Sequence, residues 1–370
     1  MSVNESKIIT NRTTNFLLSA IMLFWVLSTL KSILIPFVMA LFFAMLLQPS
    51  IRYMNKHGFP NWLSVAIMSI LTLGISIIVI SIISNTVGQI VESGPEIVRK
   101  VSTKLEIFVV WLNSLTPYHF DMDNIKNTSM SLLTGEWITG SLGSLFSFVG
   151  SFTGSFLIFA LYFVILLASF GNYERYILYV GGKENGQQFL FTFEKVMESI
   201  TTYMNIKFFV SAVTGILFWV ICTLFGIKFA MFWGFMTFAL NFIPNIGSVF
   251  ATFPPILLGI IHFDSSFLMI FFSILLISVQ MIIGNVIEPY LTGNRLRLNI
   301  IIVIFGLLFW GYIWGIVGAL LAVPLLVLVR VILEQYPGTR IIARLMGTKE
   351  AFNETKSPES SSQSRKRRSK

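Results

Sequence analysis

The stretch Asn241-Phe242-Ile243-Pro244-Asn245-Ile246-Gly247 decides how the chain folds, because it interrupts an apolar segment that runs from Phe229 to Phe263. Each half of that segment has about 15 residues, or roughly 22 Å of helix, which is shorter than a hydrocarbon core about 30 Å thick. Pro244 and Gly247 leave backbone groups unpaired, and membranes tolerate such groups only inside protein or beside a wet cavity. The segment is therefore predicted to enter the membrane and turn back as a re-entrant hairpin.

A second apolar segment, 298–329, is broken in the same way by Gly311-Tyr312-Ile313-Trp314-Gly315. It aligns with the first segment at a constant offset of about 70 residues, which indicates an internal repeat. If basic loops stay in the cytoplasm, the first hairpin enters from outside and the second from the cytoplasm. Two such units in opposite orientation form an inverted repeat, from which transporters build alternating access. The alternative interpretation is that both breaks only kink ordinary membrane-spanning helices.

The composition places the rest of the chain in a membrane as well. Apolar residues make up 55% and charged residues only 12% of the chain, and the mean hydropathy is +0.79. Soluble domains carry about a quarter charged residues, so this chain cannot cover a water-facing surface of its own size. Its apolar runs do not alternate as β-barrel strands would. The predicted fold class is an all-α integral membrane protein, a multi-spanning helical bundle with two broken re-entrant hairpins.

Changes in charge and hydropathy divide the chain into successive segments. The one at 85–145 differs in kind, because its apolar residues recur every three or four positions between charged ones, which indicates an amphipathic helix. Gly94-Pro95 is predicted to break or kink that helix. Its apolar face either packs on the membrane or on neighbouring spans, or forms an oligomer seam. In order, the segments are a cytoplasmic N-terminal tail (1–15), N-terminal transmembrane helices (16–84), an extracytoplasmic amphipathic helical segment (85–145), a transmembrane helix with a cytoplasmic linker helix (146–207), a transmembrane helix with the first hairpin (208–263), a transmembrane helix with the second hairpin (264–347), and a disordered basic cytoplasmic tail (348–370).

The positions of the basic residues orient the chain. Arg52 and Lys56 follow the first apolar helices, and a basic run at 365–370 lies in a Ser-rich tail. Cytoplasmic loops carry an excess of Lys and Arg, so both termini are predicted to be cytoplasmic and 85–145 extracytoplasmic. A basic run can also bind nucleic acid or anionic lipid. We prefer a disordered cytoplasmic tail and expect no nucleic-acid partner.

The sequence excludes several kinds of chemistry. Cys222 is the only cysteine, so disulfides and cysteine-based metal sites are ruled out, and the three histidines are too scattered to share a metal. The chain has no P-loop motif, no His-Glu-x-x-His motif and no Ser or Asp pair in a recognisable catalytic setting. We therefore expect no catalytic residue, no metal and no cofactor, and we expect that the protein is not an enzyme.

Polar residues and glycines near the two breaks are the candidates for a substrate site or a gate. Amide side chains donate and accept hydrogen bonds where the helical ladder fails. Polar residues inside membrane helices mark substrate or ion paths, and paired interruptions in corresponding positions point to a binding site at the membrane midplane. The candidates are Asn241, Pro244, Asn245, Gly247, Gln280, Asn285, Gly311 and Gly315.

Glu288 is the acidic residue near the hairpins, and two roles are open to it. A carboxylate inside a membrane helix can bind an ion or a proton and so couple transport to a gradient. Because Glu288 precedes Pro289 near the predicted cytoplasmic interface, it can instead form a structural ion pair with Arg295 or Arg297. The sequence does not decide between ion coupling and a structural pair.

Taken together, these motifs resemble the autoinducer-2 exporter family of membrane permeases. The resemblance rests on 241–247, on Asn285-Val286-Ile287-Glu288-Pro289 and on Phe309-Trp310-Gly311, and it covers nearly the whole chain. It implies a multi-pass permease of the bacterial inner membrane that forms homo-oligomers and exports the quorum-sensing signal autoinducer-2. Other members of the family are assigned to sodium/proton antiport, so the resemblance does not determine the substrate.

We therefore expect a membrane transporter whose partners are the lipid bilayer, a small-molecule substrate and further copies of the same chain. The first hypothesis is export of a small polar molecule through the hairpin region. The second is sodium/proton exchange, with Glu288 as the coupling carboxylate. The third belongs to another class, a membrane scaffold that transports nothing. The broken hairpins argue against it, because a scaffold has no use for unpaired backbone in the bilayer.

Overall fold

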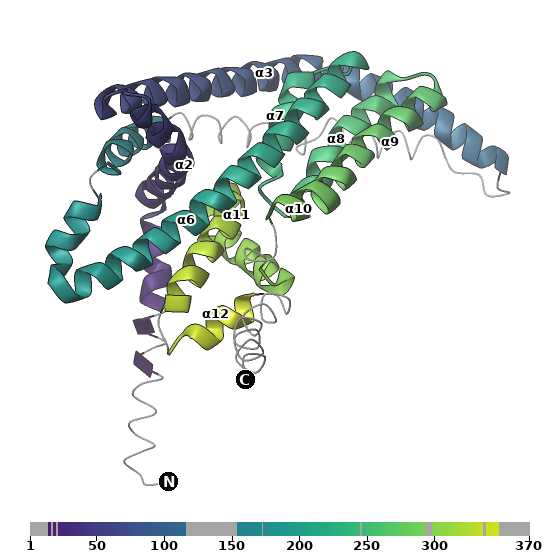
Figure 1. The fold of residues 1–370 in the computed structure, drawn as a ribbon. Helices are drawn as coiled ribbons and strands as arrows, with labels where there is room; N and C mark the ends of the chain where they lie inside the picture. Colours follow the sequence, from purple (N-terminus) through teal and green to yellow (C-terminus); the bar gives the residue numbers. More distant parts are fainter. Residues whose placement is uncertain are drawn as a thin grey trace, which may run out of the picture. The chain divides into compact units, whose positions relative to one another are not determined.

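The computed structural model describes residues 14–15, 18–19, 21–115, 154–171, 173–244, 246–292, 298–335 and 338–347. The chain, drawn in sequence colours in Figure 1, consists of two compact units. Unit 1 contains Met1–Val65, Leu157–Met204 and Asn294–Lys370, and unit 2 contains Ala66–Phe156 and Asn205–Gly293. Each hairpin therefore belongs to a different unit, and the predicted inverted relation between the hairpins stays a prediction.

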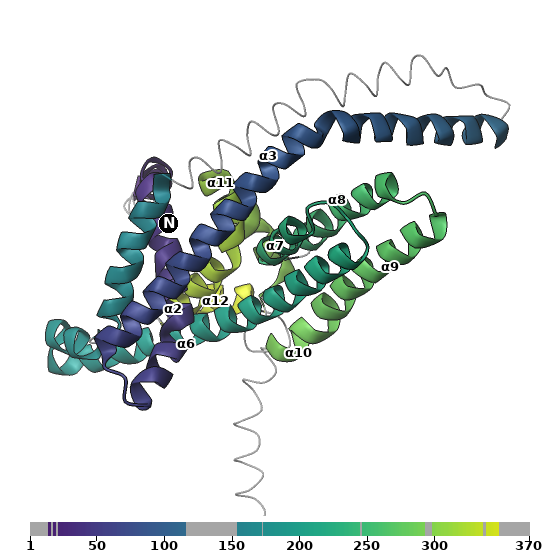
Figure 2. The same ribbon diagram turned by 90° about the horizontal axis from the view of Figure 1, so that it is seen from above.

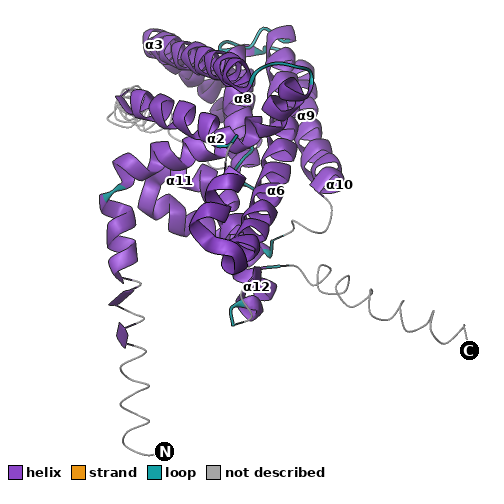
Figure 3. Ribbon diagram, turned by 60° about the vertical axis from the view of Figure 1, so that its left-hand side comes forward, coloured by secondary structure: helices purple, strands orange, loops and turns teal. Residues whose placement is uncertain are grey.

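Helices account for all the regular structure in the described ranges, as Figure 3 shows. Three shorter apolar helices, among them Gly154–Ser169, accompany the longer ones. The predicted all-α membrane fold is confirmed. Within the described residues, five helical stretches are long and apolar enough to cross a membrane, namely Lys31–Lys56, Asn61–Gly94, Gly186–Leu224, Ser266–Thr292 and Ile300–Gln335.

The first helix of unit 1 continues into α2 (Lys31–Lys56) through a bend at Leu30. The Leu30 N–H donates to the Val26 carbonyl, and the Leu30 carbonyl accepts from the Leu34 N–H, each at 2.9 Å. These bonds keep the helical spacing on both sides of Leu30, so the chain bends there without reversing its direction.

Aromatic contacts hold α2 against the helix Gly154–Ser169 in unit 1. The ring of Phe37 meets Tyr162 edge-on, with ring centroids 5.5 Å apart, and Phe43 meets Phe159 in the same way at 5.8 Å. Edge-to-face pairs add about 0.5–1.5 kcal/mol to the free energy gained by burying the rings. These two pairs fix the level at which the two helices lie beside each other.

Helix α6 (Tyr173–Leu224) begins in unit 1 and ends in unit 2. Its 52 residues form two helices joined at Gly182, which has φ 66° and ψ −177°. Glycine adopts a positive φ without the steric cost that a Cβ would impose. The stretch Gly186–Leu224, after this joint, is the apolar part of the helix.

The second predicted hairpin is present in unit 1 as α11 (Ile300–Gln335), which is broken at Gly315. Gly315 has φ 64° and ψ −146°, and only glycine adopts this conformation readily. The two arms fold back on each other, since a Cβ built on Gly306 would lie 2.5 Å from a methyl carbon of Leu326. In a straight helix these two residues would lie about 30 Å apart. The break therefore makes a hairpin, and the alternative of a simple kink is wrong here.

The tip and the base of this second hairpin are both tied down within unit 1. At the tip, the indole N–H of Trp314 donates to the Leu27 carbonyl at 3.1 Å. At the base, Leu298 and Gly347 form an isolated antiparallel bridge, which brings helix α12 (Arg340–Met346) against the start of α11. The second hairpin is thus a fixed part of unit 1.

Unit 2 contains most of the long helix α3, the second half of α6, and the first hairpin. Its core is formed by side chains of α6 and of α9, with Ile227 between α6 and α7. In Figures 1 and 2, helices α7, α8 and α9 run beside one another. The helices are α3 (Asn61–Leu115), α7 (Ala230–Leu240), α8 (Ile246–His262), α9 (Ser266–Ile282), a π-helical turn η1 (Ile283–Ile287) and α10 (Glu288–Thr292). The core residues are Phe218, Ile221, Cys222, Ile227, Phe272 and Leu276.

Helices α6 and α7 approach each other closely at two glycines. A Cβ on Gly215 would lie 2.6 Å from the Gly234 carbonyl oxygen, and a Cβ on Gly234 would lie 2.6 Å from Cβ of Trp219. Small residues at a helix crossing let the backbones come together, as is common in membranes. This crossing brings the first hairpin directly against α6.

Helix α3 runs without interruption through Gly94-Pro95, so of the two predicted outcomes, a break or a kink, the break is wrong. A proline inside a helix commonly bends it, and Figure 2 shows α3 curving along its length. Residues 116–145 of the predicted extracytoplasmic segment lie outside the described residues.

Charged contacts fasten the C-terminal part of α3 to two loops of unit 2. Lys104 contacts Asp264, in the loop between α8 and α9, at 3.0 Å. Glu96 contacts Lys228, in the loop between α6 and α7, at 2.8 Å, and Lys100 at 3.0 Å. Both loops therefore lie at the same end of unit 2, next to residues 96–104.

Hydrogen bonds from Lys228 and then Lys100 lower the pKa of Glu96 to about 2. The hydrogen bond from Lys104 likewise lowers the pKa of Asp264. A depressed folded-state pKa gives stability that is present above the ordinary pKa of the carboxyl group and is lost only as the pH falls toward the folded value. These contacts therefore persist at any pH near neutrality.

Candidate functional site

The tip of the first hairpin is a compact turn between α7 and α8. The Ile243 N–H donates to the Leu240 carbonyl at 2.8 Å, and the Gly247 N–H donates to the Ile243 carbonyl at 3.1 Å. Pro244 has no N–H to donate, so the helical ladder ends at the tip. Helices α7 and α8 pack on each other, and the predicted hairpin is present.

The geometry of this tip requires glycine at position 247. A Cβ on Gly247 would overlap the carbonyl oxygen of Leu240 and crowd Cβ of Ile243. Gly247 is also buried. The role of Gly247 is thus to let the turn close. Gly247 shapes the site but offers no polar side chain to a ligand.

Helix α6 presents a buried polar face toward this hairpin. Lys207, Ser211 and Thr214 are spaced by four and three residues, so they lie on one face of the helix. Their exposed fractions are 3%, 0% and 1%. Burying polar groups in an apolar surrounding is costly unless they find partners. This face therefore calls for polar contacts from neighbouring helices.

Asn241, the first residue of the tip, makes one of these contacts. Its Nδ2 donates to Oγ of Ser211 at 3.0 Å, and the pair is buried. The Asn241 N–H still donates to the Thr237 carbonyl at 3.0 Å, so α7 holds the backbone while the side chain reaches α6. An amide and a hydroxyl have more donors and acceptors than one mutual bond uses. Together they can bind a hydroxyl or carbonyl group.

Glu288 makes the second contact to the same face of α6. Its Oε1 lies 2.5 Å from Nζ of Lys207. The Lys207 side chain is 4% exposed and the Glu288 side chain 26%, so the pair is largely covered by protein. The structure therefore gives Glu288 a partner that the sequence did not suggest. The predicted partners Arg295 and Arg297 lie outside the described residues.

These two contacts lie close together along α6. Ser211 follows Lys207 by four residues, which is about 6 Å along a helix axis. Since Asn241 bonds to Ser211 and Glu288 bonds to Lys207, the hairpin tip lies about one turn from the ion pair. We call Lys207, Ser211, Asn241 and Glu288 the polar site.

Pro289 explains the π-helical turn that precedes Glu288. Without an N–H, Pro289 cannot donate to the Asn285 carbonyl four residues earlier, and its ring would crowd that carbonyl. The wider turn relieves the conflict, and the Glu288 N–H donates to the carbonyl of Ile283, five residues back. Such turns often occur at functional sites. Here the turn sets the direction from which Glu288 meets Lys207.

On α7 and α9, two further polar side chains have a buried oxygen without a hydrogen-bond partner among the described residues. They are Oγ1 of Thr237, one turn before Asn241 on α7, and Oε1 of Gln280 on α9. Gln280 was a predicted site residue, whereas Thr237 was not. Buried polar atoms are nearly always paired, so these two oxygens are exceptions that call for a partner. A hydrogen-bond donor on a ligand could supply one.

The remaining predicted candidates that the structure describes do not join the polar site. Asn285 is exposed in the π-helical turn. Gly311 and Gly315 belong to the second hairpin, in unit 1. Asn245 lies outside the described residues, so its predicted role stays a prediction. Among the predicted polar candidates in the described ranges, Asn241 and Glu288 alone form contacts with α6 in the polar site.

The sequence carries a signal for Lys207 and Ser211, but a simpler interpretation competes with it. A cation beside an apolar run, such as Lys207, commonly marks the membrane interface. The spacing of Lys207, Ser211 and Thr214 along an otherwise apolar helix would have shown a polar face. In the described part of the chain, no group of three or more His, Cys, Asp or Glu residues is placed to hold a metal ion.

Comparisons with known proteins point to one family. A family model described as AI-2E family transporter matches residues 15–338. The chain is similar to the AI-2 transport protein TqsA of Escherichia coli strain K12, with 27% identity over 325 residues, 85% of this chain and 89% of that protein.

Two further relatives carry names that give transport as a predicted role. One, from Haemophilus influenzae, is 26% identical over 86% of this chain and 91% of its own length. The other, from Borreliella burgdorferi, is 31% identical over 65% of both chains. Since the family model spans the membrane helices and both hairpins, the chain belongs to the AI-2E family of transporters.

Proposed function

The chain is a multi-pass membrane permease, and we propose that it exports a small polar molecule by way of the polar site. The observation that supports this most is the buried bond between Asn241 and Ser211 at the unwound tip of a hairpin. Unwound backbone inside a membrane protein commonly lines a substrate path. A ligand with hydroxyl and carbonyl groups would replace that bond with bonds of its own.

Autoinducer-2 is the substrate to test first. The E. coli relative is named for AI-2 transport, and at 27% identity this name serves as a proposal for the present chain. A small, hydroxyl-rich molecule suits the chemistry of the polar site, where Ser211 and Asn241 offer a hydroxyl and an amide group.

We further propose the setting in which this activity takes place. The permease would lie in the bacterial inner membrane with both termini in the cytoplasm, as the basic residues suggest. It would work as a homo-oligomer, with the lipid bilayer and the small-molecule substrate as its other partners. The α6–α7 and α8–α9 loops, held by residues 96–104, would then face outward.

The test is efflux from proteoliposomes that contain the purified chain. Vesicles loaded with autoinducer-2, with a sugar of similar size or with a small amino acid are diluted into buffer with and without proton or sodium gradients. We expect autoinducer-2 to leave these vesicles faster than it leaves protein-free vesicles loaded in the same way. Equal, background efflux of every compound under all gradients would contradict the proposal.

Sodium/proton antiport remains a second candidate because of one observation. The Glu288 side chain stays 26% exposed while its partner Lys207 is almost fully covered, so an ion or proton can reach the carboxylate. In an antiporter, one carboxylate binds both ions in turn. Sodium-driven pH changes inside vesicles that hold no organic substrate would favour this function over export.

A further inference from the structure

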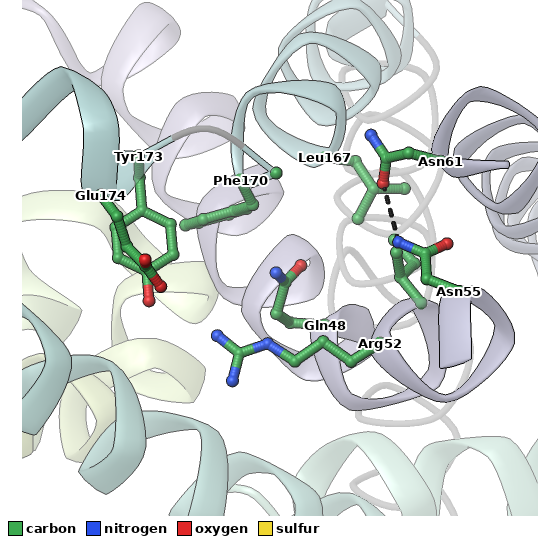
Figure 4. A pocket seen from close by; sticks show the side chains of 10 residues that line it. Gln48, Arg52, Asn55, Asn61, Leu167, Phe170, Tyr173 and Glu174 are labelled. Atoms are coloured by element: carbon green, nitrogen blue, oxygen red, sulfur yellow. Dashed lines mark hydrogen bonds between the residues drawn. The ribbon is translucent and has the colours of Figure 1, made fainter.

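A separate polar cavity lies in unit 1, far along the sequence from the polar site. Its volume is about 170 Å³, and it lies where the end of α2 meets the start of α3 and the link between helix Gly154–Ser169 and α6. This is smaller than the roughly 300–1,000 Å³ of pockets for drug-sized ligands. The cavity therefore suits a compact polar group. Figure 4 shows the side chains that line it.

The floor of the cavity is buried and contains an unsatisfied amide. Gln48 is 7% exposed, and its Oε1 has no hydrogen-bond partner among the described residues. Leu167 and Phe170 cover it from the neighbouring helix. A buried amide without a partner is uncommon in proteins and points to a ligand that supplies one.

The rim of the cavity carries charges of both signs. Arg52 lies one turn after Gln48 on the α2 wall, and Glu174 lies in the first turn of α6 on the other wall. In Figure 4 the Arg52 side chain extends toward Tyr173 and Glu174. Burial raises the pKa of Tyr173, so the phenol stays neutral and does not cancel the charge of Arg52. A ligand that carries both a cation and an anion matches these two walls.

A pair of asparagines completes the rim on the other side. Asn55 Nδ2 donates to Oδ1 of Asn61 at 3.1 Å, and the hydroxyl of Ser64 donates to Oδ1 of Asn55 at 2.7 Å. These bonds fix the Asn55 and Asn61 amides across the turn between α2 and α3. Gly171 lets the Asn61 side chain approach, since a Cβ on Gly171 would lie 3.1 Å from Nδ2 of Asn61. The wall is thus built of oriented side chains.

Exposed aromatic side chains lie on the helices and the turn that form the cavity. Tyr53, Phe59 and Trp62 are 65%, 44% and 70% exposed, and Tyr176 and Tyr179 on α6 are 71% and 86% exposed. Aromatic side chains of this kind gather at the level of lipid headgroups. The cavity therefore lies where a headgroup, with its phosphate and its amine, comes within reach.

We propose that this cavity binds a phosphoethanolamine group, with the phosphodiester beside Arg52 and the ammonium beside Glu174. Arginine binds phosphate oxygens through paired N–H donors, and a primary ammonium donates to a carboxylate and to an amide oxygen such as that of Gln48. Two sources carry this group, a phosphatidylethanolamine lipid and a soluble phosphoethanolamine compound. The aromatic surroundings favour the lipid.

The test measures thermal stabilisation of the full chain in detergent by short-chain lipids. Phosphatidylethanolamine is compared with phosphatidylglycerol, which lacks the amine, and with phosphatidylcholine, whose quaternary amine cannot donate. Glycerophosphoethanolamine forms the soluble arm. We expect phosphatidylethanolamine to raise the Tm most. Stabilisation by the soluble compound as well would support the site and assign it to both sources.

Three variants locate the effect in the cavity. Arg52→Gln should weaken phosphatidylethanolamine binding about tenfold, since it removes a charge-assisted contact. Glu174→Gln should abolish the preference for phosphatidylethanolamine over phosphatidylglycerol. Lys56→Gln, an exposed cation one turn after Arg52 that does not line the cavity, is the matched control and should behave like the wild type.

The design separates loss of binding from loss of folding. Arg52 and Glu174 are exposed, so both variants should keep the Tm of the lipid-free wild type. If Arg52→Gln does not give a monodisperse protein, Arg52→Lys keeps the charge and should bind with intermediate strength. Equal stabilisation by all three lipids, or unchanged lipid preference in Arg52→Gln and Glu174→Gln, would overturn the proposal.

Discussion

At the scale of single residues, the polar site consists of two contacts on one face of α6. The Asn241–Ser211 bond links the hairpin tip to the helix, and the Lys207–Glu288 pair links the start of α10 to it. The first contact joins two neutral groups and can be exchanged for bonds to a ligand at small cost. The second joins two charges with little water around them, so removal of one leaves the other unpaired.

The Lys207–Glu288 pair separates a structural role from ion coupling. A buried charge without its partner costs about 3–5 kcal/mol, so Lys207→Met should lower membrane abundance and Tm. The swapped protein, Lys207→Glu with Glu288→Lys, should regain abundance because the pair is restored with opposite polarity. Fluorescence-detected size-exclusion chromatography of the wild type, of Lys207→Met and of the swapped protein checks this expectation.

Transport by the Glu288→Gln variant then decides whether the carboxylate couples an ion. Loss of gradient-driven flux at normal abundance indicates coupling, whereas loss of both abundance and flux indicates a structural pair. Efflux is measured between pH 6 and pH 8. Normal abundance together with full-rate efflux at every pH would exclude both roles for Glu288.

At the scale of elements, both hairpins depend on glycines at places where backbones meet. The tip of the first closes only because Gly247 leaves room for the Leu240 carbonyl. The arms of the second touch where Gly306 faces Leu326. Sequence reasoning predicted both hairpins from their Gly and Pro breaks, since helices this short cannot cross a membrane. It had no means to find which residue on the opposite arm each glycine faces.

Gly247→Ala should distort the tip of the first hairpin. The added Cβ overlaps backbone, which cannot give way as a side chain can, so we expect a lower Tm and loss of efflux. Gly74→Ala is the matched control, because nothing lies within 4 Å of its Cβ on α3. Alanine there should be neutral or stabilise by up to about 1 kcal/mol through helix propensity. Equal Tm values for the two variants would show that the tip is not closed as described.

A double-mutant cycle tests the packing of the second hairpin. Gly306→Ala should cost about 1–3 kcal/mol because its Cβ meets a methyl carbon of Leu326. Leu326→Ala removes that methyl group, so the cost of Gly306→Ala should fall when both changes are combined. Urea or thermal unfolding of the four proteins measures the coupling. Strict additivity would mean that the two arms do not touch.

At the scale of the whole molecule, the sequence determined the class and the family but not the polar site. The apolar composition required a helical membrane protein, and the spacing of the breaks required hairpins. Lys207 is not predicted as a buried residue, because one lysine at the edge of an apolar run is usually an interfacial anchor. Its pairing with Glu288 joins positions 81 residues apart, and only the folded chain brings them together.

The predicted orientation of the chain can be measured by cysteine labelling. In a Cys222→Ser background, a cysteine at Asp264 should react with a membrane-impermeant reagent added outside, because that loop faces outward in the proposed topology. A cysteine at Ser364, in the basic tail, should react only after the membrane is opened. Labelling of Ser364→Cys in intact cells would contradict the topology and the inverted repeat with it.

The central claim is that the substrate passes the tip of the first hairpin, and one efflux comparison tests it most directly. Asn241→Ala removes the side chain that bonds to Ser211, while Ser273→Ala removes a hydroxyl that bonds only to the Met269 carbonyl of its own helix. In proteoliposomes with equal amounts of folded protein, we expect Asn241→Ala to lower the efflux rate at least about tenfold, the equivalent of one or two lost hydrogen bonds. Ser273→Ala should match the wild type. Wild-type efflux from Asn241→Ala at equal abundance would place the substrate path elsewhere in the protein.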